Sequence, residues 1–127
     1  MKIKYIIFIF LFYVLNSTKV YSIEPDVFVQ STVNKASSVL SSEMSKEKKI
    51  SELKLIAKET VDIKGIGFYT LGSTRKTLND EQKKKYAELF EQYFLKSFSS
   101  RLAEYTNPEI SVEGKKVLSE KYTIVNS

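Results

Sequence analysis

Apolar positions recur with helical spacing in two stretches near the start of the chain. The first begins at Pro25, which suits a first helical turn, and ends at Leu40. The second follows Ser45, a suitable N-cap, and alternates an apolar face with lysines and glutamates that form a solvated face. We therefore predict amphipathic helices over 25–40 and 46–61.

The longest helical pattern follows a polar loop. Asn79 with Gln82 three residues later is typical of a capping box, and the acidic Asp80 suits the positive end of a helix. The helix should end at about Tyr105, because Pro108 follows. Its buried stripe is wide and rich in rings: Tyr86, Leu89, Phe90, Tyr93, Phe94, Phe98, Leu102 and Tyr105.

The segment between these helices, residues 61–72, has no single interpretation. Asp62 could cap a short helix that Gly72 ends. Gly65 and Gly67 would weaken such a helix by about 1 kcal/mol each relative to alanine, so a loop or a strand competes. The apolar pattern does not decide between them.

The residues after Pro108 change character. Residues 109–114 and 116–127 are rich in β-branched side chains and partly alternate, with Gly114, Lys115 and Lys116 between them. We predict two strands joined by a turn at 114–116, and hence an α+β fold whose antiparallel sheet is incomplete. Because an isolated hairpin is marginal in water, we expect residues 23–127 to be the N-terminal portion of one longer domain.

The N-terminus has the pattern of a secretory signal. A basic start with Lys2 and Lys4 precedes an unbroken apolar run of eleven residues, 5–15. Small residues at Val20 and Ser22 predict cleavage after Ser22 and export to the periplasm. The apolar run is shorter than the about 20 residues needed to span a bilayer, which favours a cleaved signal over an anchor.

Composition removes several kinds of chemistry. The chain of 127 residues has no His, Cys or Trp, which excludes disulfides, thiolate nucleophiles, histidine acid–base catalysis and nearly every zinc site. Its net charge of +5 falls to +2 without residues 1–22, which hold three lysines and no acid. The mature chain then has 17 basic and 15 acidic residues, too even a balance to indicate nucleic-acid binding.

The remaining polar groups do not indicate an enzyme. Glu88 and Glu91 follow three lysines on the wet side of the long helix, where surface ion pairing is the better interpretation. The glycines of 65–72 lack the phosphate-loop pattern. Arg75, in the loop before a helix N-terminus, could bind a phosphate or carboxylate, although pairing with Asp80 is favoured by spacing. The ring stripe fits a packed core or a cavity for an acyl chain equally well.

Residues 61–107 resemble the signature region of the MlaC family, also called the toluene-tolerance family. Two departures are Thr74, where members usually have an aromatic residue, and the glycines Gly65 and Gly67 in a segment that is usually a better helix. The matching positions, in order, are Asp62, Leu71-Gly72, Arg75-Lys76-Thr77, Gln82-Lys83, Tyr86, Phe90, Leu102 and Tyr105.

The resemblance implies a periplasmic phospholipid-binding carrier without catalysis, cofactor or metal. Such a carrier would pass lipids between an inner-membrane lipid ABC transporter complex and an outer-membrane lipoprotein complex, maintaining outer-membrane lipid asymmetry. Arg75 would lie near the headgroup. The pocket-side candidates are Leu71, Tyr86, Phe90, Phe94 and Phe98.

Family members continue with further strands and a C-terminal helix that close the cavity. We therefore expect this chain to be a truncated product. Because the missing elements close the cavity in family members, lipid binding by this chain alone is the property to test. The alternative is a small exported interaction module that binds no lipid and whose ring stripe packs on a partner protein. A hydrolase that uses only carboxylates is the third and weakest hypothesis.

Overall fold

The computed structural model describes residues 22–127, so the predicted signal segment, apart from its last residue, lies outside the described residues. Within residues 22–127, four α-helices and a 3₁₀ turn precede a two-stranded antiparallel hairpin, which confirms the α+β prediction. No helix between Ser22 and Ser127 is long and apolar enough to cross a membrane. The elements are α2 (Pro25–Leu40), α3 (Lys46–Thr60), α4 (Ile63–Thr70), η1 (Gly72–Lys76), α5 (Asp80–Leu102), β1 (Gly114–Ser119) and β2 (Tyr122–Asn126).

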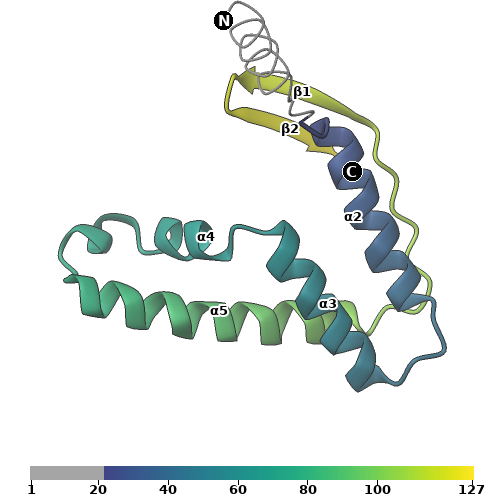
Figure 1. Cartoon of the computed structure of the whole chain (residues 1–127), viewed down its shortest axis with the longest axis horizontal. Coiled ribbons are helices and arrows are strands. Elements are labelled where there is room, and N and C mark those ends of the chain that lie inside the picture. The colour runs from purple at the N-terminus through teal and green to yellow at the C-terminus, as the bar shows by residue number, and fades with distance from the viewer. Residues whose placement is uncertain (1–21) are drawn as a thin grey trace, which may run out of the picture.

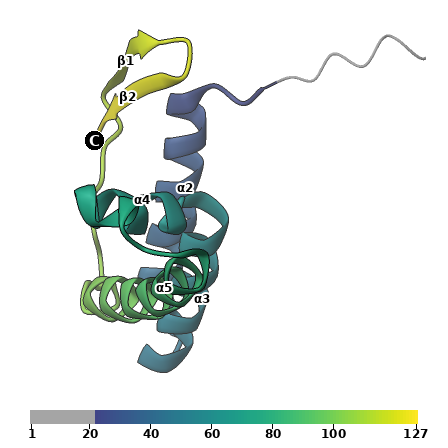
Figure 2. The same ribbon diagram turned by 90° about the vertical axis from the view of Figure 1, so that its left-hand side faces the viewer.

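The elements form two arms that meet at α3. In one arm α4 lies beside α5, and the η1 turn that joins them is at the far end of the molecule (Figure 1). In the other arm the hairpin lies beside the N-terminal part of α2 (Figures 1 and 2). Helix α3 packs against both α2 and α5 and so connects the arms.

The first two helices begin and end as the sequence predicts, apart from one residue at the end of α3. Pro25 opens α2, and the Ser45 hydroxyl accepts a hydrogen bond from the Lys48 backbone N–H at 3.3 Å. The joint between them is closed by Lys49, whose Nζ donates to the Leu40 carbonyl at 2.8 Å. A lysine at that position satisfies one of the carbonyls that a helix C-terminus leaves without an intrahelical partner.

Residues 63–70 form a short helix, which decides between the alternatives left open by the sequence. The Asp62 carboxylate accepts from the Gly65 N–H at 2.9 Å and caps the first turn. Gly72 has a positive φ of 54°, the left-handed conformation that glycine adopts without steric cost, and the chain turns there into η1. The cap and packing against α5 outweigh the low helix propensity of the two internal glycines.

Helix α5 has the predicted capping box but ends earlier than predicted. The Asn79 side chain accepts from the Gln82 N–H at 2.8 Å, and the Gln82 side chain accepts from the Asn79 N–H at 3.0 Å. The helix ends at Leu102 rather than at about Tyr105. Glu104 and Tyr105 instead donate to carbonyls three residues back, a tighter turn that precedes the turn-forming pair Thr106 and Asn107.

The predicted turn at 114–116 is wrong. Those residues lie inside β1, where Gly114 pairs with Asn126 and Lys116 with Ile124. The hairpin turns at residues 120–121, since Ser119 pairs with Tyr122, and the Ser119 hydroxyl accepts from the N–H of residue 121 at 3.3 Å. Residues 109–113 are not a strand. Gly114 suggested a turn, but the pairing that places it in a strand involves residues 12 positions away.

The core is small and lies where α3, α4 and α5 meet. Ala57, Ile63 and Leu95 form its buried cluster, with Leu40 and Leu53 buried along α2 and α3. The hairpin contributes little to it, because the side chains of Val117, Leu118, Tyr122 and Ile124 are exposed. Much apolar surface therefore remains uncovered among residues 22–127.

Candidate functional site

Four aromatic rings stack in a row along α5. Tyr86, Phe90, Phe94 and Phe98 follow one another at intervals of four residues, which places them on neighbouring turns of one helix surface. Adjacent ring centroids are 5.9, 6.2 and 5.4 Å apart, with interplanar angles of 27°, 25° and 12°. We call these four residues the aromatic ladder. At 1.5 Å rise per residue it extends about 18 Å along α5.

Helix α4 covers the first half of the aromatic ladder. A Cβ atom added to Gly67 would lie 2.8 Å from Phe90 Cδ1, so the missing side chain lets the ring lie against the α4 backbone. At the end of α4 the Thr70 hydroxyl is 2.9 Å from the Tyr86 hydroxyl. The sequence identified the four ladder residues but did not predict these contacts, because a glycine within a helix is compatible with several structural roles.

The aromatic ladder is neither fully core nor fully surface. Phe90 and Phe94 pack against the buried cluster on one side and stay half-buried. Phe98 keeps 38% of its surface exposed. On the same helix, Leu89 and Tyr93 are 51% and 70% exposed. This helix therefore carries a long aromatic surface that packing within residues 22–127 covers only in part.

The structure does not bring the other two predicted site residues into the aromatic ladder. Leu71 follows Thr70 at the end of α4 and is half-buried. Arg75 lies on η1, is exposed, and does not pair with Asp80. The Asp80 carboxylate is instead 3.8 Å from Lys83, and Glu91 pairs with Lys58 of α3 at 3.1 Å rather than with a lysine of its own helix.

A hollow of about 470 Å³ lies between α4 and α5 beside the aromatic ladder. Phe68 and Ala87 supply its apolar lining, and the six remaining lining residues are charged. None of the four ladder rings lines it. This hollow is therefore a separate surface from the exposed parts of the ladder rings, and the uninterrupted row of rings is the better candidate for contact with an acyl chain.

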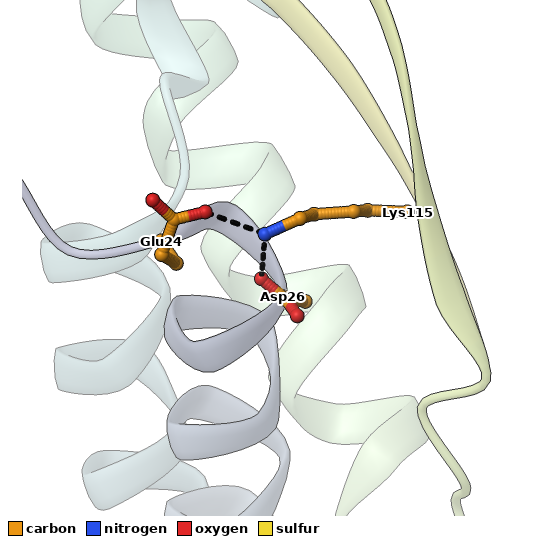
Figure 3. A network of polar contacts seen from close by, with 3 residues as sticks. All are labelled: Glu24, Asp26 and Lys115. Atoms are coloured by element: carbon orange, nitrogen blue, oxygen red, sulfur yellow. Dashed lines mark hydrogen bonds and ion pairs between the residues drawn. The ribbon is translucent and has the colours of Figure 1, made fainter.

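A polar network holds the hairpin to the start of α2 (Figure 3). The Lys115 ammonium group donates to the Glu24 carboxylate and, at 2.8 Å, to the Asp26 carboxylate. The hydrogen bonds that Lys115 donates to Asp26 and then to Glu24 raise the pKa of Lys115, and the hydrogen bond that Asp26 accepts from Lys115 lowers the pKa of Asp26. Sequence reasoning missed this network, since 89 to 91 positions separate the partners.

A comparison with protein-family models then identifies the chain. The model described as MlaC protein matches residues 30–127, which include α3 to β2 and most of α2. The chain belongs to the MlaC family. The match covers the aromatic ladder and η1 together, as the resemblance in residues 61–107 predicted. Neither the search of curated proteins nor the search of solved structures returned a match.

Membership in the MlaC family supports a general role in lipid-binding transport. The MlaC family is a lipid-transport family rather than an enzyme family. The aromatic ladder lies within the matched residues, so a physical candidate for the lipid contact and the family assignment fall in the same part of the chain.

Proposed function

We propose that this protein is a periplasmic phospholipid carrier and that the aromatic ladder of α5 is the surface on which an acyl chain lies. The observation that carries the proposal is the unbroken stack of four rings left partly uncovered. Its length of about 18 Å is close to the depth of one bilayer leaflet, about half of the ~30 Å hydrocarbon core. Each CH₂ group covered by the rings contributes about 0.8 kcal/mol.

The roles within the site follow from position and chemistry. Phe98 is the most exposed of the four ladder rings, Phe94 stacks beside it, and Leu71 adds an apolar side chain at the end of α4. Arg75 on η1 is an exposed planar donor that suits a phosphate headgroup kept near water. Shielding apolar tails requires no nucleophile or metal, in keeping with a chain that has no His or Cys.

The family assignment extends the proposal to partners. The carrier would exchange phospholipid with an inner-membrane lipid ABC transporter complex and an outer-membrane lipoprotein complex, and so help to keep the outer membrane asymmetric. Support for this comes from membership of the MlaC family.

The test uses the chain exported by its own N-terminal segment and purified from the periplasm. Native mass spectrometry and lipid extraction should find phospholipid bound in a fixed ratio. Phe98→Glu should lower that ratio strongly, because it places a charge on the aromatic ladder at a position already 38% exposed.

Leu55→Glu is the matched control, since Leu55 lies on α3, outside the aromatic ladder, and is 53% exposed. A folded, lipid-free wild-type chain would overturn the carrier proposal and favour an exported interaction module. Equal loss of lipid in both variants would overturn the assignment to the aromatic ladder while leaving the carrier function in place.

A further inference from the structure

The positive charge of the chain is concentrated at one end of the structure. Residues 72–85, which we call the basic cap, carry five basic and two acidic side chains, a net of +3. The rest of residues 22–127 carry twelve basic and thirteen acidic side chains, a net of −1. The basic cap therefore accounts for all of the net positive charge of the described chain.

The charges of the basic cap are available to a partner. All of its fourteen residues are exposed except Leu78 and Lys83, which are half-buried. The Lys83 ammonium group forms an ion pair with the Asp80 carboxylate. No carboxylate within residues 22–127 forms an ion pair with the four other basic residues, which are Arg75, Lys76, Lys84 and Lys85.

The shape of the basic cap suits an extended surface rather than a single anionic group. It comprises η1 and the first turns of α5, at the far end of the α4–α5 arm (Figure 1). Successive residues of a helix point about 100° apart, so Lys84 and Lys85 project in different directions. Beside the cap, on the last turn of α4, Tyr69 is 85% exposed, and its ring has the amphipathic character favoured at membrane interfaces.

We propose that the basic cap binds the surface of a bilayer that contains anionic phospholipid. Many mobile anionic headgroups match charges that point in several directions, whereas an acidic protein partner would need carboxylates fixed in a matching arrangement. The inference goes beyond the carrier function, because surface binding requires no lipid to be carried. It would bring the Tyr86 end of the aromatic ladder towards the membrane, since Tyr86 directly follows the cap.

The experiment is co-sedimentation of the purified chain with vesicles. The wild-type chain should bind mixed phosphatidylglycerol–phosphatidylcholine vesicles at low salt and bind pure phosphatidylcholine vesicles only weakly. It should dissociate from the mixed vesicles as the salt concentration is raised. Each lysine near an anionic surface contributes about a fivefold factor in binding, so Lys76→Gln, Lys84→Gln and Lys85→Gln together should weaken it about 100-fold. Arg75 is left unchanged because the carrier proposal assigns it a role.

The control neutralises three lysines elsewhere, Lys46→Gln, Lys48→Gln and Lys54→Gln on α3, which changes the net charge by the same amount. This variant should keep most of the binding. The proposal would be overturned if both triple variants lost vesicle binding equally, or if the wild-type chain failed to bind anionic vesicles at low salt. An acidic protein would then be the partner to seek. Bound lipid measured in the same samples reports on the carrier function separately.

Discussion

The contact between Gly67 and Phe90 leads to a prediction whose sign depends on two opposing terms. Gly67→Ala should stabilise α4 by about 1 kcal/mol through helix propensity alone. The new Cβ would lie 2.8 Å from Phe90 Cδ1 and 3.0 Å from Cγ, closer than side-chain atoms normally approach. Overpacking of this kind typically costs about 1–3 kcal/mol.

The steric term should win, because the ring has little freedom to move away. The two close atoms are at the root of the Phe90 ring, and the ring is stacked between Tyr86 and Phe94. We expect Gly67→Ala to lower the free energy of unfolding by about 1 kcal/mol, and the urea midpoint by about 0.5–1 M. Gly114→Ala is the control, since a Cβ there meets no atom within 4 Å.

A double mutant separates the two terms. In a Phe90→Ala background the close contact is absent, so Gly67→Ala should become neutral or stabilising by up to about 1 kcal/mol. Urea unfolding followed by circular dichroism measures all four chains of the cycle. If Gly67→Ala stabilises the wild-type background, or has the same effect in both backgrounds, the role of Gly67 in seating the Phe90 ring is wrong.

Three further predictions follow from single contacts. Ser99→Ala should raise the melting temperature by a few degrees, about 1 kcal/mol, because the Ser99 hydroxyl is fully buried without a hydrogen-bond partner within residues 22–127; an unchanged or lower melting temperature would contradict this. Asn79→Ala should cost about 1 kcal/mol of unfolding free energy in urea by removing the α5 cap, whereas loss of the neighbouring exposed Asp80 should cost less. Because the pKa of Asp26 is lowered, the stability that Asp26 contributes is present above its ordinary pKa of 3.8 and is lost as the pH falls through the folded pKa. Because the pKa of Lys115 is raised, the stability that Lys115 contributes is present below its ordinary pKa of 10.5 and is lost as the pH rises through the folded pKa. Asp26→Asn should flatten the acid limb of a pH–stability profile, and an unaltered limb would show that the network does not stabilise the fold.

The sequence predicted the elements whose signals are local. The helix over 25–40, the Ser45 cap and the Asn79–Gln82 capping box are confirmed, because a cap and an apolar stripe are complete within a few turns. Two strands after Pro108 were predicted correctly, but the first strand and the turn were placed too early in the chain, since strand pairing depends on partners that local residue preferences do not encode.

In the candidate site, too, the sequence predicted the local features but not the contacts between elements. Spacing brought Tyr86, Phe90, Phe94 and Phe98 onto one surface of a helix, and the structure adds that the rings stack and that α4 covers only part of them. Hydropathy could not separate core from cavity wall, because both require the same apolar residues. Spacing favoured an ion pair between Arg75 and Asp80. The Asp80 carboxylate instead pairs with Lys83, because Lys83 lies about one helical turn from Asp80.

The attachment of the hairpin to α2 has a consequence for the order of folding. Lys115 meets Glu24 and Asp26 across 89 to 91 positions, so that contact can form only after a loop of that length has closed. The contacts of α3, α4 and α5 join neighbours in the chain and require much shorter closures. The α3–α5 unit should therefore assemble first and protect its amide hydrogens longest, while the hairpin docks late and exchanges its amides through local opening.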